Sequence, residues 1–268
     1  MRTLHNYLIL YDAECPMCNL YTDAFTKSGM LDPNGRAAYQ TALEACPLVD
    51  RQRAVNEIAL IDTRTGEVRY GIDSLFKIIG HSIPLLRPLF AWPPFQWTMR
   101  KAYSFISYNR KVIIPAPKTA TLQPSFSLKY RIAWLLFTIA IAATILTRYA
   151  HLLTGVIPAG NPFREYLICA GQVFCQGMVV TLLAREKRWD YLGNMMTISL
   201  AGSLALLPAI VIASLTRLSP VIAAGWFLLV AALMFLEHIR RTKLLGLGWT
   251  FSITWALYRL LILILILI

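Results

Sequence analysis

The sequence is poor in acidic residues, in histidine and in glycine-rich loops. Of its 268 residues, 14 are Asp or Glu, 26 are Lys or Arg, and four are His. No glycine-rich phosphate-binding loop occurs, and no stripe of Lys and Arg alternates with aromatic residues. The positive net charge of +12 therefore does not indicate nucleic-acid binding, for which such a stripe is typical. Instead, Lys and Arg mostly flank long apolar runs, as in membrane proteins.

Cysteine is also scarce, and its placement argues against a metal site. Only Cys15 and Cys18, of five cysteines, form a Cys-x-x-Cys pair. A zinc site needs four ligands, and a second pair usually supplies the other two. Before the apolar runs the remaining candidates are Cys46, His5 and His81, which are scattered. We therefore expect no metal and no cofactor, with half of a zinc site and an inert pair as the alternatives.

The Cys-x-x-Cys pair lies where a strand is expected to pass into a helix. An apolar run over Tyr7–Tyr11 predicts a buried strand, and Pro16–Lys27 predicts a helix with Pro16 in its first turn. Cys15 is then at the helix N-terminus, where free N–H groups and the helix dipole favour a thiolate. Cys18 follows one turn later on the same side. This arrangement indicates a redox dithiol.

The spacing also suggests a role for each residue of the pair. We expect Cys15 to be the attacking thiolate and Cys18 the resolving thiol, because a mixed disulfide on the outer sulfur is released by the inner one. Asp12 precedes the pair and has two alternative roles. It either accepts a proton from the buried cysteine or caps the start of the helix.

The motif and several later segments resemble one family. Asp-x-x-Cys-x-x-Cys over Asp12–Cys18, after an apolar strand, is similar to the DCC family of thiol-disulfide oxidoreductases. Ile58–Asp62 and Tyr70–Leu75 resemble later strand and helix segments of that family, and Ala102–Arg110 resembles its closing helix. The resemblance covers about residues 5–113. It implies a thioredoxin-like fold and a redox-active dithiol.

One position departs from thioredoxins in general. No proline precedes the expected strand at Ile58, where a cis-proline usually faces the dithiol; Asn56 and Glu57 stand there instead. The departure concerns how a substrate strand would dock. It does not affect the dithiol chemistry.

The alternation of short strands and helices predicts an α/β layer fold in the N-terminal part. We expect a thioredoxin-like domain over residues 1–118, a linker over 119–129 and an all-α transmembrane bundle over 130–268. Within the first domain, Leu85–Trp97 is rich in proline and tryptophan. It is either a packed extension of the domain or a membrane-interface segment, because Trp is enriched at headgroup depth.

Five apolar runs follow, and most approach the roughly 20 residues needed to cross a bilayer. They are Tyr130–Tyr149, Tyr166–Ala184, Leu192–Leu215, Val221–Leu236 and Leu247–Ile268. Lys and Arg are denser before the first run, after the second and after the fourth. The positive-inside rule then predicts a cytoplasmic N-terminal domain at a bacterial-type inner membrane. The fifth run is the least regular, because Arg259 lies near its middle. We therefore expect four or five spans.

The apolar runs contain further candidates for chemistry. Cys169 and Cys175 lie on the second run and are too far apart on one helix to form a disulfide with each other. They are either ordinary buried cysteines or a relay for electrons. Polar residues of the membrane half are candidates for an internal cluster, although Glu237 and His238, after the fourth run, are either a charged cytoplasmic boundary or a proton or quinone site. The candidates are Gln172, Gln176, Asn194, Glu237, His238 and Arg259.

Together these features predict a membrane-anchored thiol-disulfide oxidoreductase acting on the cytoplasmic side. Its expected partners are the lipid bilayer, a thiol or disulfide substrate and an unidentified electron donor, without nucleic acid. Two alternatives remain open. One is a transporter or membrane enzyme in which the dithiol senses redox state, and the other is a non-catalytic interaction module on a membrane anchor.

Overall fold

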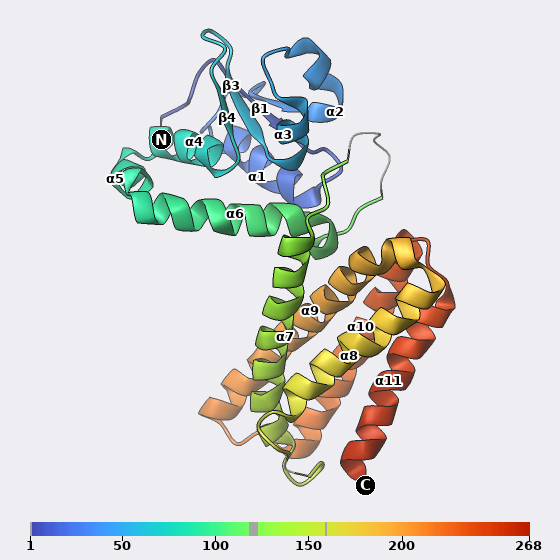
Figure 1. Ribbon diagram of the computed structural model, residues 1–268. Coiled ribbons are helices and arrows are strands. Elements are labelled where there is room, and N and C mark those ends of the chain that lie inside the picture. Colours follow the sequence, from blue (N-terminus) through green and yellow to red (C-terminus); the bar gives the residue numbers. More distant parts are fainter. Residues whose placement is uncertain (1, 118–122, 159) are drawn as a thin grey trace. The chain divides into compact units, whose positions relative to one another are not determined.

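The computed structural model describes residues 2–117, 123–158 and 160–268, and the chain divides into two compact units (Figure 1). The first unit is Met1–Tyr130 and the second is Arg131–Ile268. Lys118 and residues 119–122 of the expected linker lie outside the described residues. Residues 123–125 contact the first unit, since Gln123 Nε2 donates to Glu14 and the Ser125 N–H donates to Asn56 Oδ1.

The first unit is built around a four-stranded mixed sheet in the order β2-β1-β3-β4. β1 (Tyr7–Tyr11) pairs in parallel with β2 (Arg36–Ala38) and antiparallel with β3 (Ala59–Asp62). β4 (Val68–Tyr70) pairs antiparallel with β3, as a hairpin requires. This mixed sheet with its helices is the predicted thioredoxin-like α/β fold.

The two central strands are buried on both faces, because helices cover each side of the sheet (Figure 1). Ile9 of β1 and Leu60 of β3 belong to a core cluster that also contains Phe25 and Ile78. The neighbouring residues along each strand point to the opposite face, since side chains alternate along a strand. Leu10 there packs in a second cluster with residues of the helices between β2 and β3. The result is a three-layer domain.

The helices of the first unit fill the intervals between strands. They are α1 (Pro16–Lys27), α2 (Tyr39–Ala42), α3 (Arg51–Asn56), α4 (Ile72–Ser82), α5 (Arg87–Ala91) and α6 (Pro93–Ile113), with 3-10 turns at Leu43–Ala45 and Pro84–Leu86. On α1 the buried face is formed by Cys18, Thr22 and Phe25. Leu20 is 74% exposed, because it lies off the i, i+4, i+7 line of that face and so points to a different side of the helix from Phe25.

The proline- and tryptophan-rich segment is helical in the structure. Pro93 and Pro94 occupy the first turn of α6, where a missing N–H costs nothing, and Trp92 is the extended residue before it. The later part of α6 coincides with the closing helix suggested by the resemblance. Its inward side carries Tyr103, Ser107 and Arg110, which follow one another at helical spacing.

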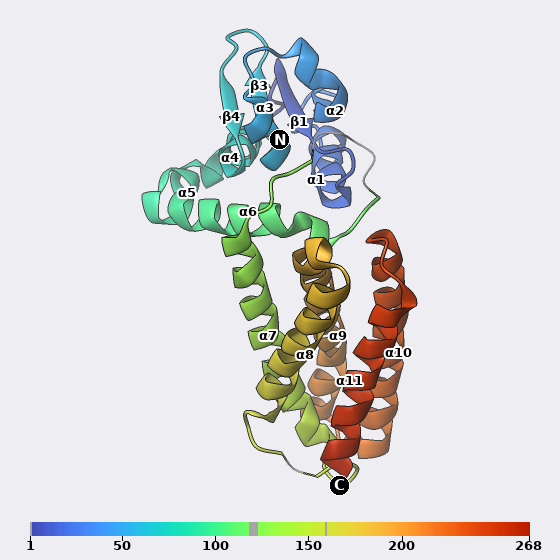
Figure 2. The same ribbon diagram turned by 45° about the vertical axis from the view of Figure 1, so that its right-hand side comes forward.

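The second unit consists of five helices that are long and apolar enough to cross a membrane (Figure 2). They are α7 (Leu128–Ala150), α8 (Arg164–Leu183), α9 (Arg188–Leu215), α10 (Pro220–Leu244) and α11 (Trp249–Leu267). Short 3-10 turns at His151–Leu153 and Arg185–Lys187 extend α7 and precede α9. All five expected runs are thus helical, including the fifth, and they are consistent with an integral membrane protein.

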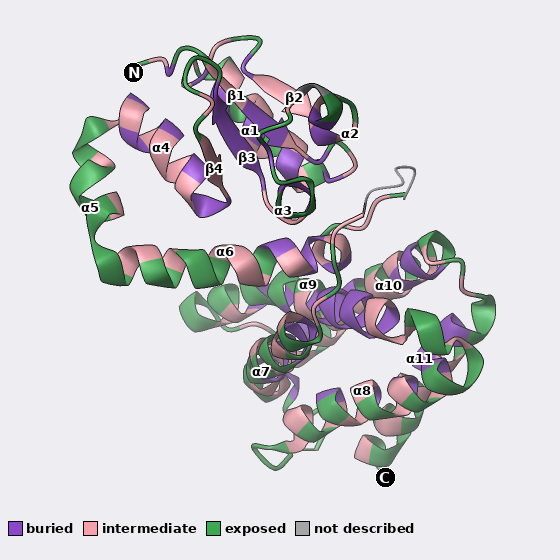
Figure 3. Cartoon of the chain, turned by 45° about the horizontal axis from the view of Figure 1, so that its top comes forward, coloured by how far each residue is buried: buried purple, intermediate pink, exposed green. Residues whose placement is uncertain are grey.

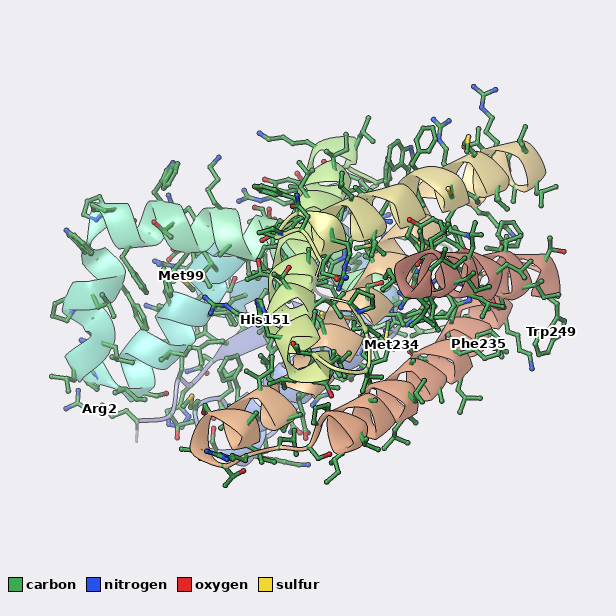
Figure 4. All side chains as sticks on the ribbon, turned by 90° about the horizontal axis from the view of Figure 1, so that it is seen from below. Arg2, Met99, His151, Met234, Phe235 and Trp249 are labelled. Carbon is green, nitrogen blue, oxygen red and sulfur yellow. The ribbon has the colours of Figure 1, made fainter. Side chains whose placement is uncertain are left out.

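Small residues let the helices of this unit approach one another. A Cβ added to Gly202 of α9 would collide with the Met234 Sδ of α10, so the side chain of Met234 occupies the space above the glycine. Figure 4 shows Met234 and Phe235 adjacent on α10. Both pack against buried residues of neighbouring helices.

Candidate active site

Cys15 and Cys18 lie at the junction of β1 and α1, where the sequence places them. Cys15 is the N-cap residue of α1, with an extended backbone (φ −91°, ψ 109°), and its Sγ accepts the Cys18 N–H at 3.4 Å. Both cysteines are free and buried. The Cys15 sulfur thus occupies the position in which a Ser or Asp side chain caps other helices.

The surroundings favour a thiolate on Cys15 and a thiol on Cys18. The Cys18 side chain donates a hydrogen bond that lowers the pKa of Cys15 to about 7, and the Cys18 N–H and the charge of Arg110 act in the same direction against burial. Because Cys18 must keep its proton to donate this hydrogen bond, the same bond raises the pKa of Cys18, and burial raises it further. Near neutral pH the pair therefore ionises at Cys15 before Cys18.

Asp12 forms a buried ion pair with Arg110 of α6. Its Oδ2 accepts from Arg110 Nη2 at 2.8 Å, and both side chains are less than one-tenth exposed. Its Oδ1 accepts from Gln40 Nε2 at 2.8 Å and from the Glu14 N–H at 3.1 Å. Within the described residues, neither oxygen bonds to a cysteine. Asp12 was expected either to accept a proton from the buried cysteine or to cap the start of the helix. The geometry agrees with the second role, since Asp12 accepts the Glu14 N–H just before α1. The sequence did not predict its ion pair with Arg110.

Arg110 joins three segments around the dithiol. Its Nη2 donates to the Val55 carbonyl at 2.8 Å and its Nη1 to the Asn56 carbonyl at 2.9 Å. Val55 and Asn56 lie just before the strand at Ile58, in the region where thioredoxins usually have a cis-proline. In this protein the Arg110 guanidinium binds the backbone carbonyls of that region. Arg110 Nε is buried and has no hydrogen-bond partner in the described part of the chain.

Two tyrosines complete the buried surroundings of Cys18. The Tyr21 side chain hydrogen-bonds Cys18 and thereby lowers the pKa of this thiol. Burial raises the pKa of both Tyr21 and Tyr103, so their hydroxyls stay protonated at physiological pH. Tyr103 also accepts the Ile58 N–H at 3.1 Å, which fixes α6 against β3.

Sequence reasoning missed Arg110 as a site residue, although a signal existed. Tyr103, Ser107 and Arg110 lie three or four residues apart and therefore share one side of a helix. An arginine that continues a polar line on the inward side of a helix predicts a buried partner, because an unpaired buried charge is costly. The partner, Asp12, is 98 residues away in the sequence, and no local pattern identifies it.

The scattered ligand candidates do not converge. Among the residues that the structure describes, no three His, Cys, Asp or Glu side chains gather in a way that could hold a metal ion. His5 contacts Asp32 at 2.7 Å, and His81 Nε2 lies 3.1 Å from the Thr3 carbonyl oxygen. Cys46 is half-buried beside the core cluster between the sheet and its second helical layer.

The second unit contains the predicted internal polar cluster. Its centre is Tyr191, whose hydroxyl donates to Gln176 Oε1 at 2.7 Å and lies 3.4 Å from His238 Nε2. His238 Nδ1 in turn lies 3.1 Å from Ser252 Oγ, so α8, α9, α10 and α11 all contribute. Such bonds between apolar helices join them in a bilayer.

The other polar candidates in this unit lie around that centre. Asn194 Oδ1 accepts from Arg241, which also pairs with Glu237. Arg259 donates to Ser199 and lies over the Trp255 ring at 4.2 Å. Gln172 is buried next to the Trp255 backbone. Of the two cysteines on α8, Cys169 is buried and Cys175 is half-buried, and neither is in a disulfide.

Comparison with known proteins supports the N-terminal assignment. Residues 9–114 match the family described as DCC1-like thiol-disulfide oxidoreductase. No curated protein and no solved structure matches the chain. The matched range begins within β1 and ends just beyond α6, so it includes the dithiol, Asp12 and Arg110. Residues 9–114 are thus similar to this family, and five helices long and apolar enough to span a membrane follow them.

Proposed function

We propose that this protein is a membrane-anchored oxidoreductase that reduces a disulfide substrate with the Cys15–Cys18 dithiol on the cytoplasmic side of the membrane. One observation carries the proposal. The Cys15 sulfur caps a helix and accepts hydrogen bonds from Cys18, which lowers its pKa to about 7 and makes it a thiolate nucleophile at neutral pH.

The reaction has two exchange steps. The Cys15 thiolate attacks one sulfur of the substrate disulfide, forms a mixed disulfide with it and releases the other sulfur as a thiolate, which takes up a proton. The Cys18 sulfur, after losing its proton, attacks Cys15 and releases the second substrate thiol. Two electrons reach the substrate, and the protein is left with a Cys15–Cys18 disulfide. A dithiol donor must then reduce that disulfide.

The electrostatics of the site support the order of the steps. The main cause of the high pKa of Cys18 is its hydrogen bond to the Cys15 sulfur. That sulfur is neutral in the mixed disulfide, so this cause disappears when Cys18 has to act. The charge of Arg110 remains, and it lowers the pKa of Cys18. The second step therefore becomes easier once the first has occurred.

The direction of electron flow follows from the compartment. A cytoplasm keeps thiols reduced, so a dithiol that faces it rests mainly in the reduced form. Reduction of a substrate is then favoured over formation of disulfides. The lipid bilayer, the substrate and the electron donor are the proposed partners.

A trapping experiment tests the proposal. In a full-length Cys18→Ser variant the mixed disulfide on Cys15 cannot be resolved, so we expect it to accumulate, and mass spectrometry identifies what is attached. The matched control is Cys15→Ser/Cys18→Ser, which keeps the other three cysteines. An adduct that persists in this control, or a Cys15→Ser variant that still reduces disulfides, contradicts the proposal.

A further inference from the structure

Large apolar side chains are exposed from the 3-10 turn before α5 to the start of α6. Leu85 is 87% exposed, Leu89 41%, Trp92 57% and Trp97 65%. These four residues, called here the Trp92 face, follow one another within 13 positions of the sequence. In Figure 3 the exposed colour extends over α5 and the beginning of α6, and burial increases toward the end of α6. Isolated exposed leucines are common, but a contiguous set with two tryptophans marks an interaction surface.

The exposure of this face does not come from loose packing. On the inward side, Phe90 of α5 and Phe95 of α6 both stack on Phe76 of α4, with ring centroids 4.4 and 5.8 Å apart. Arg87 Nε also donates to the Gly80 carbonyl at 2.8 Å. These contacts hold α5 and α6 against the domain in one orientation. The Trp92 face therefore points outward because the opposite side is occupied.

The charge around the face has one sign. The sequence contains no Asp or Glu from residue 74 to residue 164. The cations near the face are Arg87, Arg100 and Lys101, all exposed, and Lys101 Nζ lies 6.0 Å from the Trp97 ring. Arg100 is paired with Asp73 of α4, so Arg87 and Lys101 are the cations without an acidic partner in the described chain. Tryptophan and leucine beside basic residues, with no carboxylate, is the composition of segments that lie in a membrane interface.

We propose that the Trp92 face lies in the headgroup layer of the bilayer, with Arg87 and Lys101 contacting anionic lipid headgroups. The chain supplies the bilayer itself, because the five apolar helices keep the N-terminal domain close to one. Tethering raises the effective concentration of the surface, so a modest apolar face is sufficient for contact. The sequence allowed two interpretations of the proline- and tryptophan-rich segment, a packed extension of the domain or a membrane-interface segment. In this proposal both apply: its inward aromatic residues pack on the domain, and its outward residues contact the membrane interface.

Docking of this face would orient the dithiol. α6 runs without interruption from Pro93 to Ile113, and Arg110, which pairs with Asp12, lies near its far end. A helix of this length spans roughly 30 Å. The membrane contact at one end and the redox site at the other are thus joined by a single stiff element.

Photocrosslinking in the full-length protein tests the proposal. p-Benzoylphenylalanine replaces Trp92 or Trp97, and the protein is reconstituted in vesicles of equal parts phosphatidylcholine and phosphatidylglycerol. The matched control places the same group at Leu48, which is 69% exposed on the same unit but outside the Trp92 face. We expect lipid adducts, detected by mass spectrometry, to be severalfold more abundant at positions 92 and 97 than at 48. Adducts to protein alone, or equal lipid labelling at 48, overturn the proposal.

A second comparison tests the electrostatic part. Arg87→Gln/Lys101→Gln, combined with the crosslinker at position 97, is expected to remove the excess of adducts formed in anionic vesicles over vesicles of phosphatidylcholine alone. Equal adduct yields in both vesicle types for the protein without these two substitutions overturn the contact with anionic headgroups. Unchanged alkylation of Cys15 in each variant shows that the domain is folded.

Discussion

At the scale of single residues, the site depends on where three charges lie. The Cys15 thiolate, the Arg110 guanidinium and the Asp12 carboxylate are brought together from a helix start, a distant helix and the end of a strand. Asp12 raises the pKa of Cys15 and Arg110 lowers it. Arg110 is therefore a positioning residue that also lowers the pKa of the nucleophile, and its buried Nε has no hydrogen-bond partner among the residues that the structure describes.

A pH profile separates these roles of Arg110. Because the pKa of Cys15 is lowered to about 7, its alkylation by iodoacetamide should rise with pH and reach half of its maximum rate near pH 7. Arg110→Gln should move this midpoint to higher pH, since a positive charge that stabilises the thiolate is lost. Arg110→Lys keeps the charge and should leave the midpoint closer to that of the parent protein.

The same variants have a separate effect on stability. Arg110→Gln removes one partner of the buried ion pair with Asp12, which costs about 3–5 kcal/mol. Arg110→Lys keeps the charge but loses the planar guanidinium whose two Nη atoms donate to Val55 and Asn56. Thermal unfolding should therefore respond to both substitutions, whereas the alkylation midpoint should respond mainly to Arg110→Gln. An unchanged midpoint in Arg110→Gln contradicts the electrostatic role.

At the scale of elements, proline marks three successive helix starts between Pro84 and Pro94. The sequence analysis did not decide the secondary structure of Leu85–Trp97, and in the structure proline occupies the first turn of the 3-10 helix, of α5 and of α6. A cluster of prolines predicts interruptions of helical structure. Each interruption here is followed at once by a new helix, because the pyrrolidine ring of proline fixes φ at a helical value.

The contact between α9 and α10 gives a prediction at this scale. A methyl group at Gly202 needs the space of the Met234 side chain. Gly202→Ala should therefore destabilise the bundle, by about 1–3 kcal/mol if Met234 cannot move freely. Met234→Ala in the same chain should restore part of that stability. The measurement is unfolding of the full-length protein in mixed micelles, followed by circular dichroism.

The control for this pair is Gly225→Ala on α10, because no atom lies within 4 Å of a Cβ built there. It should have little effect beyond a small gain in helix propensity. If Gly202→Ala is as mild as Gly225→Ala, the close approach of α9 and Met234 is not required for stability.

At the scale of the whole molecule, five apolar helices place the two ends of the chain on opposite sides of a membrane if all five cross it. The basic residues then decide the orientation. Arg185, Lys187 and Arg188 lie between α8 and α9, and Arg240, Arg241 and Lys243 lie at the end of α10. The loop between α9 and α10 contains a single basic residue, Arg217. We propose on this basis that the N-terminal domain is cytoplasmic.

Protease accessibility tests this orientation. A cleavage site inserted at Ser219, between α9 and α10, should be cut from outside intact spheroplasts. One inserted at Gly246, between α10 and α11, should be cut only in inverted vesicles. The reverse pattern contradicts a cytoplasmic dithiol, and with it the expectation that the pair rests in the reduced form.

The outcomes at the three scales differ for a common reason. β1 and β4, α1 and the positions of all five apolar helices follow from the sequence, because periodicity and apolar length act between residues near in the chain. The exposure of Leu20 and the extent of α6 do not follow from the sequence, because they depend on which side of each helix another element covers. The internal polar cluster was predicted by composition, but its connections through Tyr191 required the packed bundle.

The sequence by itself determined the dithiol, its place at a helix start and the apolar helices that follow. Each is a property of a contiguous stretch, governed by the helix dipole, by alternation or by length. Only the tertiary structure decided that Arg110 pairs with Asp12 across 98 residues and that the tryptophans of α5 and α6 point outward. Both depend on long-range packing, in which burial of one side of a helix fixes what the other side presents.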